Sequence, residues 1–283
     1  MNLVQLAPTQ VINNELNYSL IDEIKALIPY SFAVPTVADG SWEYWLKPVG
    51  FEPISPGELS IGQLPGQLEA RTTCFFCPET ALKVALFKKG NELMIVFGAL
   101  DSFTNEVPEK DHNSKWWSVI KAGAYNLLWG RPLAFERAHQ LVQLLQNATQ
   151  FKDNQMVLVG QSFGGGLAAY TALKIANCRG ICFNSLPLGS WVNQEIEDCK
   201  NLGYAKITQV TVKLDWLPDN YLMRNREIFE SYVSMPWLPG RTLSIPTAYP
   251  GNIFETHAYI VGSLLKFTGH EITSSPREVM GNF

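Results

Sequence analysis

The chain has 283 residues, of which 46% are hydrophobic and 12% aromatic, and its formal net charge is −4. This length and apolar content can bury a large core, which excludes a globally disordered chain. Lysine and arginine are scattered along the sequence, so there is no basic patch and we expect no nucleic-acid partner. We expect one domain over residues 1–283, with a core over residues 80–267.

The N-terminal region over residues 1–75 is predicted to be an irregular wrap, because proline and glycine are frequent after a predicted helix over 19–27. Residues 1–20 lack a basic n-region and are interrupted by Asn13, Asn14 and Glu15, so they do not read as a Sec signal or a membrane span. No other run of about 18 apolar residues occurs. We therefore expect a cytoplasmic protein, or one exported by a route without a Sec-type signal peptide.

The five cysteines are an odd number, which is not typical of a disulfide framework, so we expect mostly thiols: Cys74, Cys77, Cys178, Cys182 and Cys199. Cys74 and Cys77 form a C-x-x-C pair, which can be a redox pair or half of a zinc site. No second pair completes four metal ligands, and no thioredoxin-like context follows. We interpret both as apolar fillers near a strand start and expect no metal and no cofactor.

Two apolar runs over 82–88 and 93–97 are joined by Lys89-Gly90-Asn91 and predict a β-hairpin. A polar loop follows from Asp101 and leads to Trp116 and Trp117. After it, apolar residues recur at helical spacing and predict a helix from Ala134 to Leu145.

The most informative segment is Gly160-Gln161-Ser162-Phe163-Gly164, a G-x-S-x-G sequence. A buried strand over 156–159 precedes it and a helix over 165–176 follows, the order of a nucleophile elbow. Such a turn exposes a serine hydroxyl, and the helix start supplies free N–H groups for an oxyanion. Ser162 is therefore the candidate nucleophile.

Beyond the elbow, strands are predicted over 180–183 and 207–214. Strands that alternate with helices favour an α/β fold, with a mostly parallel central sheet and helices on both faces.

A serine nucleophile needs a base, and the chain has four histidines. In this type of fold the order is Ser, then Asp or Glu, then His, which excludes His112 and His139. His139 also falls inside a predicted helix, where a surface or hydrogen-bonded role is expected. His257 stands before an apolar helix that runs to Phe267, and we favour it over His270, which lies in a polar terminal stretch.

The carboxylate that orients the histidine is predicted to be Asp215, because it directly follows the strand over 207–214. Asp219 is the alternative, although the Pro-Asp-Asn sequence is also typical of a turn. Asp198 belongs to an acidic patch with Glu195, which we interpret as a solvated helix face.

These motifs resemble those of the class 3 (fungal-type) lipases of the α/β-hydrolase superfamily, over about residues 80–267. The strand of that family ending in F-R-G-T is similar to Phe97–Leu100, and its G-H-S-L-G-G-A motif is similar to Gly160–Gly166. Its F-G-x-P-R-V-G and D-P-V-P segments resemble Phe183–Gly189 and Asp215–Pro218, and its late histidine resembles His257. Three departures are that Gln161 replaces a histidine, the arginine and threonine of the first motif are absent, and one proline is displaced.

The resemblance implies a serine esterase whose oxyanion hole uses the N–H of Phe163 and one of Leu100 or Ala99. It implies a small-molecule or lipid ester substrate, with transient contact at a membrane or lipid interface as a further expectation. Trp116 and Trp117 suit a lid or an acyl tunnel, and core packing of one or both side chains is an equal alternative. The alternatives are another acyl-transfer enzyme (thioesterase, acyltransferase or peptidase) and a non-catalytic hydrolase-like binding module.

Overall fold

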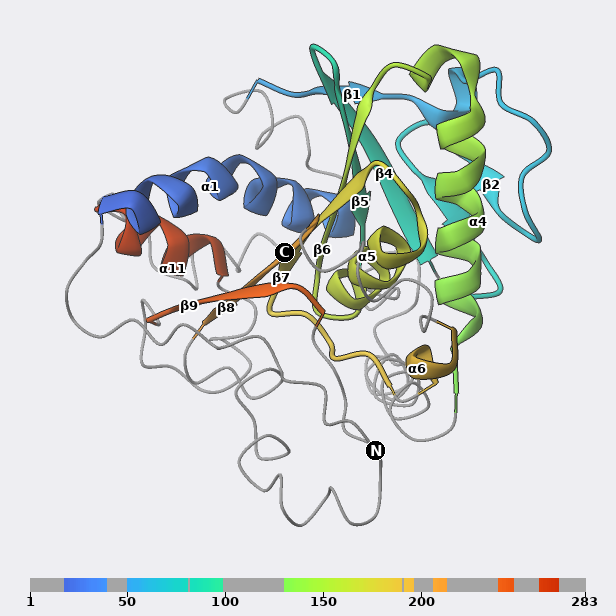
Figure 1. Ribbon diagram of the computed structural model, residues 1–283. Helices are drawn as coiled ribbons and strands as arrows, with labels where there is room; N and C mark the ends of the chain where they lie inside the picture. The colour runs from blue at the N-terminus through green and yellow to red at the C-terminus, as the bar shows by residue number, and fades with distance from the viewer. Residues whose placement is uncertain are drawn as a thin grey trace, which may run out of the picture.

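The computed structural model describes residues 18–39, 50–80, 82–98, 130–189, 191–195, 206–212, 239–246 and 260–269. Their strands form a nine-stranded sheet in the order β2-β3-β4-β5-β6-β7-β8-β9, with β1 paired to β4 (Figure 1). Helices lie against this sheet, so the described part of the chain has an α/β architecture.

One half of the sheet is antiparallel. Its strands are β1 (Glu52–Ile54), β2 (Glu69–Ala70), β3 (Phe75–Cys77), β4 (Leu82–Lys89) and β5 (Glu92–Phe97). β4 and β5 form the predicted hairpin, in register from Val84 opposite Phe97 to Lys89 opposite Glu92. A 3-10 turn, η2 (Pro56–Glu58), follows β1.

The other half is parallel and carries the elbow. β5 is followed in the sheet by β6 (Gln155–Gln161), β7 (Cys178–Phe183), β8 (Ile207–Val212) and β9 (Arg241–Ile245). Each of these strands pairs in parallel with the one before it. The sheet is therefore mixed, and the prediction of a mostly parallel sheet is correct only from β5 to β9.

The connecting helices cover one face of the parallel half. α4 (Leu133–Asn147) joins β5 to β6, with the short turn η4 (Thr149–Phe151) after it, and α5 (Phe163–Lys174) joins β6 to β7. Because the strands advance in one direction and such crossovers are right-handed, these helices fall on the same face. Their apolar side chains share one core cluster with the sheet, which Val192 of α6 (Val192–Glu195) also joins.

The opposite face is covered by helices from the two ends of the chain. α1 (Tyr18–Asp39) and α11 (Ile260–Phe267) lie together there (Figure 1) and form a second core cluster with the sheet. Helices therefore cover both faces, as predicted. None of the described helices combines the length and the apolarity needed to cross a bilayer.

The N-terminal region is more regular than the sequence suggested. α1 ends at Asp39 rather than at residue 27 and continues through Pro29, because Tyr30 and Ala33 beyond the proline are buried against the sheet. Burial of a helix face can outweigh the lost backbone hydrogen bond. β1 and β2 also belong to the sheet, so an irregular wrap over residues 1–75 does not describe this region.

Polar contacts fasten α1 to the amino ends of the parallel strands. The Tyr30 hydroxyl donates to Glu92 at 2.8 Å, and Arg179 donates to the same hydroxyl at 2.6 Å and to Glu92 at 2.9 Å. Arg241 and Glu23 form an ion pair at 2.7 Å. Because parallel strands share one direction, these contacts lie at the amino ends of the strands, whereas Ser162 follows the carboxyl end of β6.

Candidate active site

Ser162 is the single residue between β6 and α5, since β6 ends at Gln161 and α5 begins at Phe163. Its backbone angles are φ 55° and ψ −124°, a conformation that L-residues rarely adopt and that costs about 1–3 kcal/mol. Its side chain makes no capping hydrogen bond to the helix. The predicted order of strand, sharp turn and helix is confirmed, and the serine hydroxyl is not used to cap α5.

Glycines on either side of Ser162 allow this turn because backbone segments approach them closely. A Cβ on Gly160 would overlap the carbonyl group of Gly164, and a Cβ on Gly164 would overlap the carbonyl oxygen of Phe97. These contacts explain why both positions of the G-x-S-x-G sequence require glycine. The contact at Gly164 also places the start of α5 directly beside the end of β5.

Backbone hydrogen bonds tie Ser162 to the chain after β7. Its N–H donates to the carbonyl oxygen of Phe183 at 3.1 Å. Its own carbonyl oxygen accepts from Gly166 at 3.2 Å, within α5, and from Leu186 at 2.8 Å. These bonds hold the strained conformation of Ser162 from α5 and from the chain after β7. A strained backbone persists only where the surrounding structure enforces it in this way.

The amino end of α5 has the electrostatics of an anion site. The first N–H groups of a helix have no acceptor within it, and the helix dipole is positive there. No acidic residue lies in the first turn of α5. Phe163 fixes this end, because its side chain is buried and meets the ring of Phe135 edge-on, with centroids 5.4 Å apart.

The remaining predicted site residues lie outside the described residues: Asp215, His257, Ala99, Leu100, Trp116 and Trp117, with the alternatives Asp219 and His270. The described strands that precede two of these stretches, β5 and β8, end near the elbow. After β5 the chain is described as far as Gly98, whose carbonyl oxygen would lie 3.2 Å from a Cβ on Gly164. β8 runs parallel to β7 and ends at Val212, so the chain leaves it at the same sheet edge as Ser162.

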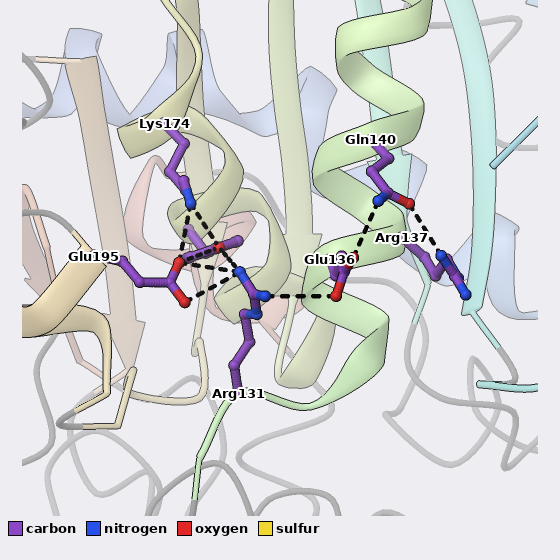
Figure 2. A network of polar contacts seen from close by, with 7 residues as sticks. Arg131, Glu136, Arg137, Gln140, Lys174 and Glu195 are labelled. Carbon is purple, nitrogen blue, oxygen red and sulfur yellow. Dashed lines mark hydrogen bonds and ion pairs between the residues drawn. The ribbon is translucent and has the colours of Figure 1, made fainter. Parts of the chain in front are cut away.

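A charged network lies on the carboxyl half of α5 (Figure 2). The carboxylate of Glu195 accepts hydrogen bonds from Tyr170 at 2.7 Å, Lys174 at 2.9 Å and Arg131 at 3.1 Å. Arg131 also pairs with Glu136 at 3.4 Å. Since the side chain of Glu195 is only 27% exposed, the prediction that Glu195 belongs to a solvated helix face is wrong.

The network keeps Glu195 ionised. Burial raises its pKa, but the hydrogen bonds from Tyr170 and Lys174 and the charges of Lys174 and Arg131 outweigh burial, so the pKa is lowered. For Tyr170, burial and the hydrogen bond to Glu195 raise the pKa of the phenol. At neutral pH, Glu195 is therefore a carboxylate and Tyr170 a neutral phenol, and these two states favour the observed contacts.

His139 lies in α4, as predicted, where it is half-buried and not fully hydrogen-bonded. Its ring centroid is 6.3 Å from that of Tyr170, and its Nδ1 is buried without a partner among the described residues. Burial and the charges of Lys174 and Arg131 lower its pKa. His139 is therefore held neutral beside the network.

The cysteines are structural where they are described. None of Cys74, Cys77, Cys178 and Cys182 forms a disulfide. Cys77 packs in the cluster on the α4 and α5 face and Cys74 against the other cluster, so the C-x-x-C pair straddles the sheet. Burial raises the pKa of the Cys178 thiol to about 12 and also raises that of Cys182. No group of metal-ligating side chains occurs in the described ranges.

Two residues with a clear structural role were missed by sequence reasoning. Asn184 directly follows β7 with φ 42°, and its side chain is completely buried. An asparagine after an apolar strand is typical of this left-handed conformation, which is a usable signal. Glu195 carried no signal, because its partners Arg131 and Tyr170 are distant in sequence.

Comparison with known proteins finds a weak likeness among solved structures. No known protein family matches the sequence. No curated protein matches it either. Among solved structures, the chain is similar to that of M37 lipase, with 12% identity, 91% of this chain and 89% of that chain covered, and a TM-score of 0.46. A likeness at this level does not extend to particular residues or to an activity.

Proposed function

We propose that the protein is a serine hydrolase of the α/β-hydrolase fold that cleaves carboxylic esters, with Ser162 as nucleophile. The observation that carries the proposal is the backbone of Ser162, with φ 55° and ψ −124° between β6 and α5. Such strain is retained where the surrounding structure enforces it and a function uses it. The nearby glycine contacts and the positive end of α5 support the same assignment.

The proposed reaction has two steps. The Ser162 hydroxyl attacks the acyl carbonyl while His257 accepts its proton, and Asp215 holds the imidazole in the required tautomer. The alcohol leaves with that proton, and water then hydrolyses the acyl-enzyme by the same route. The N–H groups of Phe163 and of Ala99 or Leu100 stabilise the oxyanion. No metal or cofactor takes part in this scheme.

The proposed substrates are lipid acyl esters, and the proposed acyl contacts are Trp116 and Trp117. If these side chains line a mobile cover, an interface that binds them would favour the open state. Activity on long-chain esters should then rise above the solubility limit of the substrate. Thioesterase, acyltransferase and peptidase activities use the same residues, so a panel of esters, thioesters and amides distinguishes them.

The direct test is labelling with a fluorophosphonate probe. Wild-type protein should be labelled at one serine, and Ser162→Ala should abolish labelling and lower the hydrolysis of p-nitrophenyl esters to a small residual rate. Ser60→Ala is a matched control, because this serine is exposed and lies outside the elbow. Labelling that survives in Ser162→Ala, or none in the folded wild type, would contradict the proposal.

The same assay assigns the other two members. Asp215→Asn should lower kcat by a factor on the order of 10⁴, because the wrong imidazole tautomer is then favoured, while Asp219→Asn should remain active. His257→Ala and the double variant with Ser162→Ala should retain the same residual rate as Ser162→Ala, because members of a triad act as one unit. Loss in Asp219→Asn or in a His270→Ala variant instead would reverse the respective assignment.

A further inference from the structure

The side chain of Asn184 completes a backbone ladder where β7 ends. β7 and β8 pair in parallel, with Phe183 opposite Val210. The N–H of Asn184 continues this ladder by donating to the carbonyl oxygen of Val210 at 2.8 Å. In a regular parallel ladder, the next bond would run from the N–H of Val212 to the backbone carbonyl of Asn184.

That next bond is made by a side chain instead. The N–H of Val212 donates to Oδ1 of Asn184 at 2.9 Å. The side-chain amide thus takes the place of the residue's own carbonyl group, a substitution for which asparagine is suited. Since the carbonyl group of Asn184 does not have to continue the ladder to Val212, the backbone can adopt φ 42° after its N–H has bonded Val210.

The released chain turns toward Ser162. Two residues after Asn184, the N–H of Leu186 donates to the carbonyl oxygen of Ser162 at 2.8 Å. The short segment from Asn184 to Leu186 therefore contacts the elbow on one side and the last residue of β8 on the other. Asn184 is fully buried, so no water competes for these bonds.

We propose that Asn184 is a positioning residue for the active site. By holding the Val212 amide, it fixes the end of β8 relative to Ser162, and the chain leaves β8 there toward Asp215. This role rests on the proposed hydrolase function, in which the carboxylate that follows β8 in the sequence, Asp215, must meet the histidine that serves Ser162. A small displacement of such a group lowers the rate because the reacting groups are no longer aligned.

The test compares two substitutions in the same turn. Asn184→Gly removes the acceptor for Val212 but allows φ 42°, so the backbone can keep its conformation. Ser185→Ala is the matched control, since the buried Ser185 hydroxyl also bonds β8, at Gln209 and 2.6 Å, but does not contact Val212. Each variant loses a buried hydrogen bond between the turn and β8.

We expect Asn184→Gly to lower kcat about 10- to 100-fold at nearly unchanged KM, and Ser185→Ala to keep kcat within about threefold. The acidic limb of the kcat/KM profile should move to lower pH in Asn184→Gly, because an imidazolium that loses its carboxylate partner has a lower pKa. Hydrogen exchange at the Val212 amide should become faster by on the order of tenfold in Asn184→Gly only. Asn184→Asp, which retains an acceptor oxygen, should restore the slow exchange.

The outcomes separate the role from the proposed function. An active wild type with equal losses in Asn184→Gly and Ser185→Ala, or with unchanged Val212 exchange in Asn184→Gly, would refute the positioning role alone. A folded wild type and Ser185→Ala that both lack ester hydrolysis would refute the proposed function, and the positioning role with it.

Discussion

At its amino end, helix α5 is held by backbone atoms in close contact, whereas its carboxyl half is held by charged side chains. The carbonyl group of Gly164, at the helix start, packs against Gly160 of β6. The carbonyl oxygen of Phe97, at the end of β5, packs against Gly164. Six residues after Gly164, Tyr170 shares the Glu195 carboxylate with Lys174 and Arg131 (Figure 2). The first arrangement has no space for a side chain, and the second consists of side chains.

This difference indicates how much change each end tolerates. Close-packed backbone cannot yield to an added atom without moving a strand or a helix, so a small substitution there has a large effect. Half-exposed charges can rearrange and recruit water, so the loss of one partner is damped. The end of α5 that carries the proposed chemistry is therefore also the end that is least tolerant of substitution.

The largest expected effect is on the glycine side. Gly160→Ala should lower the free energy of unfolding by at least about 3 kcal/mol, because its Cβ would overlap the carbonyl group of Gly164. Urea denaturation of the purified variant measures this loss. Gly62→Ala is the control, since its Cβ would meet only Leu144 at 3.5 Å, an ordinary contact. Equal stability of the two variants would show that the elbow is not tightly packed.

A smaller effect is expected in the charged network. Glu195→Gln should lower the free energy of unfolding by about 1–2 kcal/mol at pH 7, because Lys174 and Arg131 lose their shared anion. The lowered pKa of Glu195 means that its contribution is present above the ordinary value of 4.5 and is lost as pH falls through the folded-state pKa. The stabilities of wild type and variant, measured by urea denaturation, should therefore converge in acid.

The control for this network is an ion pair that lies largely at the surface. Glu69 and Arg71 are 3.1 Å apart, and their side chains are 53% and 46% exposed. Glu69→Gln should cost less than about 0.5 kcal/mol, because solvent screens such pairs. A pH-independent difference between wild type and Glu195→Gln would contradict the assigned role of the Glu195 charge.

The third and smallest of the main effects is a gain in the free energy of unfolding. Ser162→Gly should raise the free energy of unfolding by about 1 kcal/mol, because glycine adopts φ 55° and ψ −124° without strain and loses only part of that gain to backbone entropy. Ser162→Ala keeps the strain and should match the wild type in thermal stability. Both variants should lack hydrolytic activity. Equal melting temperatures of the glycine and alanine variants would show that no strain is stored at Ser162.

Much of the fold around the elbow could be predicted from local sequence. The strand, turn and helix around Ser162 follow from an apolar run, three spaced small residues and helical periodicity, which act within a few residues. The β4–β5 hairpin follows from Lys89-Gly90-Asn91, whose positive-φ glycine suits the turn. Both predictions are confirmed because their causes are local.

Other features depend on partners far apart in the sequence. Pro29 argues locally for a helix end, but α1 continues because Tyr30 and Ala33 are buried against the sheet. Glu195 looks like part of a solvated acidic run, but its partners come from α5 and from the chain before α4. The strands β1 to β3, which extend the sheet beyond the predicted hairpin, were likewise not predicted, because strands of two or three residues carry little pattern.

The sequence by itself determined the candidate nucleophile and its turn, because G-x-S-x-G between an apolar strand and a small-residue helix has a local steric meaning. Only the tertiary structure decided that the turn after β7 lies between Ser162 and Val212, and that Asn184 supplies the missing acceptor there. The reason is that a side chain acquires such a role only when two strands fix the unmet hydrogen bond beside it.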